Sequence, residues 1–231
     1  MKVIILAGGF GTRIGEYTKT IPKPLISILG KPILIHIMEL YAQHGFKEFY
    51  IALGYKGNII KKYFKKNKFT DWKINLIDTG KNTMTGGRLK RLKKYINKDE
   101  TFMMTYGDGL SNINLKKLLS FHKKNKKIAT LTAVRPPARF GALKISGNKV
   151  NFFKEKSKLD EGWINGGFFV MQSKIFNFIK NDQTYLEREP LEKLTKNKQL
   201  SAFKHKKFWQ CMDTKRDKDN LEKLLKKNYR I

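Results

Sequence analysis

A short apolar run that leads directly into glycines constrains this 231-residue chain more than any other feature. Val3–Leu6 is apolar throughout, as expected for a buried strand, and three glycines follow within Gly8–Gly11. Because glycine has no Cβ, the backbone there can approach a ligand closely, and its N–H groups can form an anion-binding concavity. Thr12 and Arg13 would add a hydroxyl and a fixed cation beside it. The segment therefore predicts a phosphate-binding turn after the first strand.

The glycine spacing argues against two common classes of nucleotide-binding protein. It lacks the G-x-x-x-x-G-K-[ST] pattern of a P-loop, and it departs from the G-x-G-x-x-G pattern of dinucleotide-binding folds. Many strand-to-helix turns contain glycine for steric reasons alone, so a structural role is the alternative interpretation.

A braced lysine, Lys23, lies about ten residues after the glycines, between Pro22 and Pro24. The two prolines hold the backbone extended and restrict the lysine. The alternative is a solvated lysine in a rigid turn. A surface lysine needs no such brace, so the pairing with the upstream glycines favours a phosphate-binding role.

Short apolar runs alternate with longer amphipathic ones along the first two-thirds of the chain, which is typical of a parallel sheet flanked by helices. The predicted strands are Val3–Leu6, Phe49–Leu53, Ile74–Ile77, Phe102–Tyr106 and Ile128–Val134. The predicted helices are Pro32–His44, Leu89–Tyr95 and Leu115–Lys124.

The pattern changes near residue 135, where shorter strands begin. The predicted strands are Phe140–Ile145, Lys149–Phe153 and Phe168–Met171, which we expect in a mixed or antiparallel part of the same sheet. Predicted helices follow at Pro190–Lys196 and Arg216–Lys227. We expect one domain over residues 1–231 with a continuous sheet, divided softly into a nucleotide-binding half (1–135) and a substrate-binding half (136–231).

Two aspartates are candidate metal ligands. Asp108 lies between Gly107 and Gly109 after a predicted central strand, where open α/β sheets bind ligands. Asp213 lies in an apolar, aromatic stretch just before a predicted helix. Two carboxylates could share one Mg²⁺ that keeps its other positions for water and phosphate oxygens. The structural alternatives are a turn aspartate for Asp108 and a helix cap for Asp213.

The chain is strongly basic, with 49 lysines and arginines against 19 acidic residues and a formal net charge of +30. Such a charge could indicate a nucleic-acid binder, and an RNA-binding protein is one alternative class. Only eight of the 49 cations are arginine, the residue that reads bases by bidentate contacts, and the lysines recur along the whole chain. We therefore favour a solvated lysine-rich surface and expect no specific nucleic-acid partner, although the positive field would attract anionic nucleotides.

Cysteine content and the N-terminus indicate the compartment. Cys211 is the single cysteine, so no internal disulfide can form. The apolar run at the N-terminus is too short for a signal peptide or a membrane span. We expect a cytoplasmic protein with no membrane partner.

The segments Leu6–Arg13 and Pro22–Leu25 resemble the signature of the sugar nucleotidyltransferases. The resemblance implies an α/β, Rossmann-like nucleotidyltransferase fold whose central sheet is mixed, mostly parallel and flanked by helices. It also implies a Mg²⁺-dependent reaction between a nucleoside triphosphate and a sugar 1-phosphate. In such a reaction Arg13 would meet the leaving phosphates, Lys23 would bridge the reacting phosphates, and Asp108 and Asp213 would hold Mg²⁺.

Further segments resemble the glucose-1-phosphate cytidylyltransferases in particular, and they occur in order along the chain. They are Asp78–Gly80, Met84–Arg91, Thr105–Gly109, Arg139–Leu143, Ile164–Phe169, Glu189–Leu191, Phe208–Trp209 and Met212–Thr214. The resemblance implies CTP and glucose 1-phosphate as substrates, CDP-glucose as product and a role in surface polysaccharide synthesis. A thymidylyl-, uridylyl- or guanylyltransferase and a non-catalytic sugar-nucleotide-binding protein are the alternatives.

The resemblance also assigns binding residues. The nucleotide would contact Leu6, Ala7, Gly8, Gly9, Gly11, Thr12, Arg13, Thr83, Arg88 and Gly107. The sugar phosphate would contact Gly141, Glu155, Lys156, Asn165 and Gly166. A solvated charge is the alternative for Lys156, and a simple turn is the alternative for Asn165 and Gly166.

Two features depart from the family pattern. Position 157 is serine where the family has proline, and the segment between Phe64 and Ile74 is short. The resemblance places the missing insert near the nucleotide and near subunit contacts, so the base and the oligomeric state stay open. We expect a homo-oligomer.

Overall fold

A seven-stranded sheet forms the centre of the molecule in the computed structural model, which describes residues 1–136, 142–154 and 162–227. The strand order is β12-β8-β11-β6-β1-β4-β5. The strands are β1 (Lys2–Leu6), β4 (Glu48–Leu53), β5 (Lys73–Asp78), β6 (Thr101–Tyr106), β8 (Ala129–Val134), β11 (Ile164–Gln172) and β12 (Leu200–His205). Neighbouring strands are parallel, except that β11 runs antiparallel to both β6 and β8. The predicted α/β fold with a mixed, mostly parallel sheet is confirmed.

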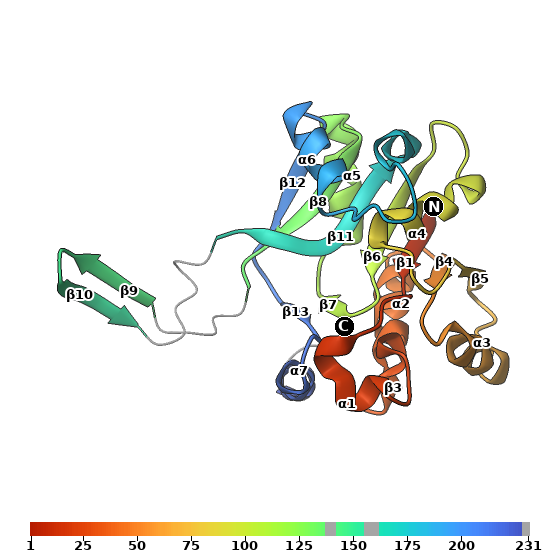
Figure 1. Cartoon of the computed structure of the whole chain (residues 1–231), viewed down its shortest axis with the longest axis horizontal. Helices are drawn as coiled ribbons and strands as arrows, with labels where there is room; N and C mark the ends of the chain where they lie inside the picture. The colour runs from red at the N-terminus through yellow and green to blue at the C-terminus, as the bar shows by residue number, and fades with distance from the viewer. Residues whose placement is uncertain (137–141, 155–161, 228–231) are drawn as a thin grey trace.

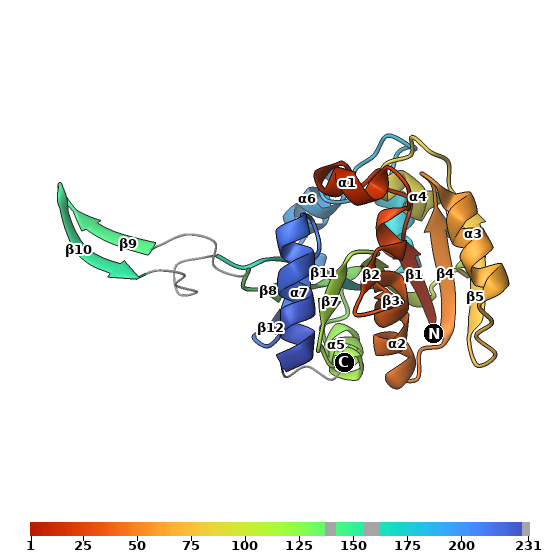
Figure 2. The ribbon, with the colours of Figure 1, turned by 90° about the horizontal axis from the view of Figure 1, so that it is seen from below.

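Helices cover both faces of this sheet (Figure 1, Figure 2). They are α1 (Gly15–Thr18), α2 (Ile33–Gln43), α3 (Gly57–Lys66), α4 (Thr85–Arg91), α5 (Leu115–Asn125), α6 (Glu189–Lys196) and α7 (Lys215–Lys227). One apolar cluster joins Val3 and Ile5 of β1 to buried residues of α2, α3, α5 and α7. The other joins Ile4 and Leu6 to buried residues of α4 and α6. Because successive side chains of a strand point to opposite faces, β1 is buried on both sides, which explains its unbroken apolar sequence.

The predicted strands of the first two-thirds end within one residue of the observed strands. The helix predicted over Leu89–Tyr95 is wrong at its start, because α4 begins at Thr85 and a separate 3-10 turn covers Lys93–Tyr95. Helix α4 contains Gly86 and Gly87, which pack against the backbone of residues 182–184. There is no room for a larger side chain at these two positions. A Cβ on Gly87 would lie 2.3 Å from the carbonyl oxygen of Asp182.

Three pairs of short strands complete the structure. They are β2 (Ser27–Ile28) with β3 (Lys31–Pro32), β7 (Gly109–Ser111) with β13 (Trp209–Cys211), and β9 (Ala142–Ser146) with β10 (Lys149–Lys154). The β9–β10 hairpin stands away from the main sheet (Figure 1), so the prediction that these strands belong to that sheet was wrong. Leu143, Ile145, Val150 and Phe153 expose half or more of their surface there, since none of the described residues forms a layer over the hairpin.

No described helix is long and apolar enough to cross a membrane.

Candidate active site

The glycine loop follows β1 at the carboxyl edge of the sheet, and its backbone is fixed by neighbours. The Gly8 carbonyl accepts hydrogen bonds from Tyr55 N at 3.0 Å and from Arg88 Nη2 at 2.9 Å. Gly11 has a φ of 65°, in the left-handed region that favours glycine, and it precedes the 3-10 turn Thr12–Ile14. A residue other than glycine would therefore be strained at position 11, and a Cβ on Gly8 would lie 2.3 Å from Arg88 Nη1.

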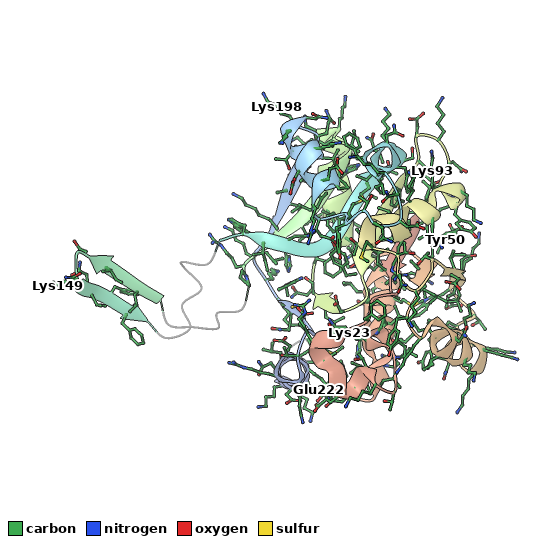
Figure 3. All side chains as sticks on the ribbon, viewed as in Figure 1. Lys23, Tyr50, Lys93, Lys149, Lys198 and Glu222 are labelled. Carbon is green, nitrogen blue, oxygen red and sulfur yellow. The ribbon has the colours of Figure 1, made fainter. Side chains whose placement is uncertain are left out.

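Lys23 lies between the two candidate metal ligands. Its Nζ is 2.7 Å from Asp108 Oδ2 and 2.8 Å from Asp213 Oδ1, and the residue is 9% exposed. Arg13 Nη1 lies 2.9 Å from the other oxygen of Asp213. The structure thus brings together all four predicted catalytic residues, which come from four separate segments of the chain. Figure 3 labels Lys23 near the centre of the molecule.

The charges in this cluster stabilise one another. Burial opposes the charge of Lys23, but the two aspartates together raise its pKa above the ordinary value. Burial likewise disfavours ionised Asp213, but the hydrogen bond and charge of Lys23 and the charge of Arg13 lower its pKa. The site therefore holds the ionised Asp213 carboxylate in contact with the Lys23 ammonium, and these groups could bind a cation and a phosphate, respectively.

The two aspartates are adjacent because β7 and β13 form one short antiparallel ladder. Cys211 pairs with Gly109, and Met212 N donates to the Asp108 carbonyl at 2.9 Å. Asp108 directly precedes Gly109 and Asp213 follows Met212 at the same end of this ladder, so residues far apart in sequence meet there.

Thr214 and Asp217 cap helix α7 and leave the Asp213 side chain for the cluster. Asp217 Oδ2 accepts from Asp213 N at 3.2 Å, from Thr214 N at 3.0 Å and from Thr214 Oγ1 at 2.9 Å. Asp217 N donates back to Thr214 Oγ1 at 3.2 Å. The alternative that the Asp213 side chain caps the helix is thus rejected. The spacing of Thr214 and Asp217 is the signal in the sequence that could have located this cap.

A cavity of about 430 Å³ opens beside the glycine loop. All of the residues predicted to contact the nucleotide line it: Leu6, Ala7, Gly8, Gly9, Gly11, Thr12, Arg13, Thr83, Arg88 and Gly107. Sequence reasoning missed further lining residues, namely Phe10, Pro24, Met84, Thr85, Tyr106 and Tyr185. Tyr185 lies in an irregular segment before α6, where no motif indicated a ligand.

Arg88 reaches the wall of this cavity while its guanidinium is bound to the protein. Nη1 donates to Leu53 O, Thr79 Oγ1 and Gly80 O, and Nη2 donates to Gly8 O and Lys81 O. Burial, followed by the nearby charge of Arg91, lowers its pKa. Arg88 lies inside α4 and not at its start, and its hydrogen bonds join the glycine loop to the loops after β4 and β5.

A second cavity of about 390 Å³ adjoins the first and shares Arg13, Tyr106 and Asp108 with it. Asn165 and Gly166, both predicted to contact the sugar phosphate, line this cavity. Trp209 Nε1 donates to the Gly166 carbonyl at 2.7 Å, and Asn165 Oδ1 accepts from Gly167 N at 2.9 Å. Gly141, Glu155 and Lys156, the other predicted contacts, lie outside the described residues. The cluster of Arg13, Lys23, Asp108 and Asp213 therefore lies where the two cavities meet.

The sequence matches the family model for nucleotidyl transferase over residues 2–218, and the chain belongs to this family. The fold and the two adjoining cavities agree with this assignment. Within the family it is a sugar-1-phosphate nucleotidyltransferase similar to the glucose-1-phosphate cytidylyltransferases.

Two curated relatives are similar over nearly their whole length. Glucose-1-phosphate cytidylyltransferase of Salmonella typhi is 47% identical, with 98% of this chain and 96% of the relative covered. A protein of Bacillus subtilis named probable glucose-1-phosphate cytidylyltransferase is 44% identical, with 93% and 92% covered. The Salmonella alignment spans 248 residues, so the relative contains residues that this 231-residue chain lacks.

One solved structure, HddC from Yersinia pseudotuberculosis complexed with GMP-PN, has the same fold. The TM-score is 0.77 at 27% identity, with 97% of this chain and 99% of that chain covered.

Proposed function

We propose that this chain transfers CMP from CTP to glucose 1-phosphate, with Mg²⁺ as cofactor, and forms CDP-glucose and pyrophosphate. The observation that carries the proposal is the cluster of Arg13, Lys23, Asp108 and Asp213 at the junction of the two cavities. One cavity would hold the triphosphate and the other the sugar 1-phosphate, so the cluster would face the reacting phosphates. The similarity to glucose-1-phosphate cytidylyltransferases supports the choice of both substrates.

The proposed reaction needs no covalent intermediate with the protein. A phosphate oxygen of glucose 1-phosphate attacks the α-phosphorus of CTP and forms a new P–O bond. The bond from the α-phosphorus to its bridging oxygen breaks, and pyrophosphate leaves with that electron pair. Catalysis then consists of positioning the two phosphates in line and of offsetting their negative charge.

The residues present fit a divalent cation. Among the described residues, no group of three or more His, Cys, Asp or Glu could hold a metal by itself. The carboxylates of Asp108 and Asp213 do lie close together, since both contact the Lys23 ammonium. Mg²⁺ typically takes one or two carboxylates and completes its shell with water and phosphate oxygens. Asp108 and Asp213 would hold it, and it would neutralise charge on the phosphates when bound.

Lys23 and Arg13 would have different roles toward the phosphates. Lys23 is nearly buried and held by the protein, so it would fix the position of the reacting phosphates. The side chain of Arg13 is 72% exposed, so it can follow the leaving pyrophosphate toward solvent. Both cations lower the cost of negative charge in the transition state.

The segment that the resemblance places near the base is short in this chain. The connection from α3 to β5 spans only residues 67–72, and it is filled by Phe69 stacked on Trp72 with ring centroids 4.9 Å apart. The related Yersinia structure was solved with GMP-PN, which makes guanylyl transfer the second candidate.

Pyrophosphate release tests the proposal. The purified protein is incubated with Mg²⁺, glucose 1-phosphate and each of CTP, UTP, dTTP, ATP and GTP in turn. Release with CTP alone supports it, and release with GTP alone moves the enzyme to the second candidate. Release with none, also when mannose 1-phosphate replaces glucose 1-phosphate, overturns it.

A further inference from the structure

Glu187 is a carboxylate at the border of the two cavities that the motifs did not indicate. It lies in the turn just before α6 and is exposed. Its Oε2 accepts a hydrogen bond from Thr85 Oγ1 at 2.6 Å, and its Oε1 accepts one from the Tyr106 hydroxyl. Thr85 begins helix α4, and Tyr106 ends strand β6, so the carboxylate joins two elements that carry the site.

Glu187 belongs to the second cavity rather than to the nucleotide cavity beside the glycine loop. It lines the second cavity together with Asn165, whereas Thr85 lines the first and Tyr106 lines both. Burial, and then the negative charge of Glu187, raises the pKa of Tyr106, which therefore stays a neutral hydroxyl that donates to the carboxylate. The Glu187 carboxylate, a hydrogen-bond acceptor, thus borders the second cavity, and the hydroxyls of Thr85 and Tyr106 hold it in place.

The partners of Glu187 are unusual in a chain with a net charge of +30. Both are neutral hydroxyls, and no ion pair to Glu187 occurs among the residues that the structure describes. Glu189, two positions along, instead forms ion pairs of 2.8 Å with both Lys180 and Lys193. A carboxylate offers about four lone-pair sites, and two hydroxyl donors leave about two for a ligand.

The two ends of the second cavity differ in charge. Arg13 lines it together with Asp108 and Asp213, the residues of the catalytic cluster, whereas Glu187 and Asn165 are outside that cluster. An anionic phosphate is attracted to the cations of the cluster and repelled by a carboxylate without a cation partner. Hydroxyl groups, by contrast, are donors that such a carboxylate accepts strongly.

We propose that Glu187 binds hydroxyl groups of the sugar and so fixes the orientation in which the sugar 1-phosphate enters, with its phosphate toward the catalytic cluster. This inference rests on the proposed function. It adds a specificity-determining residue that selects a polyhydroxylated sugar and disfavours an anionic group at the far end of the cavity.

Steady-state kinetics of Glu187→Gln test the proposal, with Glu189→Gln as the matched control on the surface. Glutamine keeps the size of the side chain but removes the charge and one acceptor. The KM for the sugar 1-phosphate should rise on the order of tenfold to a hundredfold, as expected when a hydrogen bond to a charged group is lost. The KM for the triphosphate and the melting temperature should stay near wild type, and Glu189→Gln should match wild type in all three.

Product binding gives a second measurement that does not depend on turnover. Titration calorimetry compares the Kd of the nucleoside diphosphate sugar with that of the nucleoside diphosphate alone. The gain in affinity that the sugar confers should fall in Glu187→Gln by the same factor as the KM rises.

Two results with Glu187→Gln would overturn the inference alone. An unchanged KM for the sugar 1-phosphate would remove Glu187 from the sugar site. An equal rise in both KM values would show that Glu187 acts through Thr85 on the position of α4. Wild-type protein that releases no pyrophosphate and binds no nucleoside diphosphate sugar would instead overturn the proposed function, and this inference with it.

Discussion

Lys23 joins the two acidic residues of the site. At 2.7 and 2.8 Å from their oxygens, its ammonium separates carboxylates that would otherwise repel each other. Pro22 is extended, with a ψ of 145°, but Lys23 begins the 3-10 turn Lys23–Leu25, so the prediction of an extended backbone was wrong at the lysine itself. Pro24 lies in this turn and restricts the backbone there. The brace that the two prolines predict is therefore a means of placing a nearly buried charge.

Acid should weaken the fold through Asp213. Its pKa is lowered in the folded protein, so the unfolded chain binds more protons and stability falls as pH drops below the ordinary value of 3.8. Asp213→Asn should lose less stability than wild type over that range. The measurement is the melting temperature of both proteins at several pH values between about pH 6 and about pH 3. The exposed Asp219→Asn is the control, and a wild-type pH dependence in Asp213→Asn would contradict the prediction.

Two neighbouring glycines of the loop should respond differently to alanine. A Cβ on Gly8 would lie 2.3 Å from Arg88 Nη1, and the hydrogen bonds of Arg88 prevent that side chain from moving aside. We expect Gly8→Ala to destabilise the protein by about 1–3 kcal/mol. A Cβ on Gly9 meets nothing within 4 Å, so Gly9→Ala should keep wild-type stability.

Gly9→Ala should change the kinetics although it leaves the stability unchanged. Gly9 lines the nucleotide cavity, so a methyl group there should raise the KM for the triphosphate, by about tenfold if it displaces one good phosphate contact. Urea unfolding and kinetics of both variants check the pair of predictions. A destabilised Gly9→Ala with normal kinetics would contradict the assignment of Gly9 to the cavity wall.

At the scale of elements, the ladder of β7 with β13 and the cap of α7 set the distance between the aspartates. Asp213 lies between them, and its backbone N–H donates to Asp217 at 3.2 Å. The cap therefore fixes Asp213, the proposed metal ligand, as well as the helix.

Thr214→Ala should affect both stability and rate. The substitution removes a hydroxyl that donates to Asp217 and accepts from its N–H, so we expect a loss of about 0.5–2 kcal/mol. We also expect kcat to fall by about tenfold, since small displacements of a catalytic group are costly. Thr195→Ala, whose hydroxyl donates within α6, is the control. A drop in stability with full kcat would show that the cap serves the helix alone.

The elements differ in how well the sequence predicts them. β1, β4 and β6 were predicted because strands buried on both faces have continuous apolar sequences. β12 lies at the edge of the sheet, and only His205 of its six residues is buried, so its apolar signal is weak. Helix α4 starts with a glycine pair that suggests a loop, and only its packing against residues 182–184 explains it.

At the scale of the whole molecule, the charge is spread over the surface. Figure 3 labels Lys93, Lys149 and Lys198 in separate parts of the structure, and all three are exposed. This distribution agrees with the interpretation of a solvated lysine-rich surface. Lys23, in contrast, is nearly buried between two carboxylates.

The sequence predicted which residues form the site, but it did not predict the contacts between them. Motifs identified Arg13, Lys23, Asp108 and Asp213, because each lies in a short pattern of glycines, prolines or aromatic residues. Their contacts depend on strand order and on the β7–β13 ladder, which join segments about a hundred residues apart, as the hydrogen bond from Met212 to Asp108 illustrates. Glu187 has no local pattern, and only its contacts with Thr85 and Tyr106 reveal it.

The rate of pyrophosphate release from CTP and glucose 1-phosphate by Asp108→Asn tests the central claim most directly. The exposed Asp71→Asn is the control, and the melting temperature verifies folding. If the cluster performs the transfer, kcat should fall on the order of 10²–10⁴-fold in Asp108→Asn and stay unchanged in Asp71→Asn. A folded Asp108→Asn protein that keeps most of its kcat would contradict the claim.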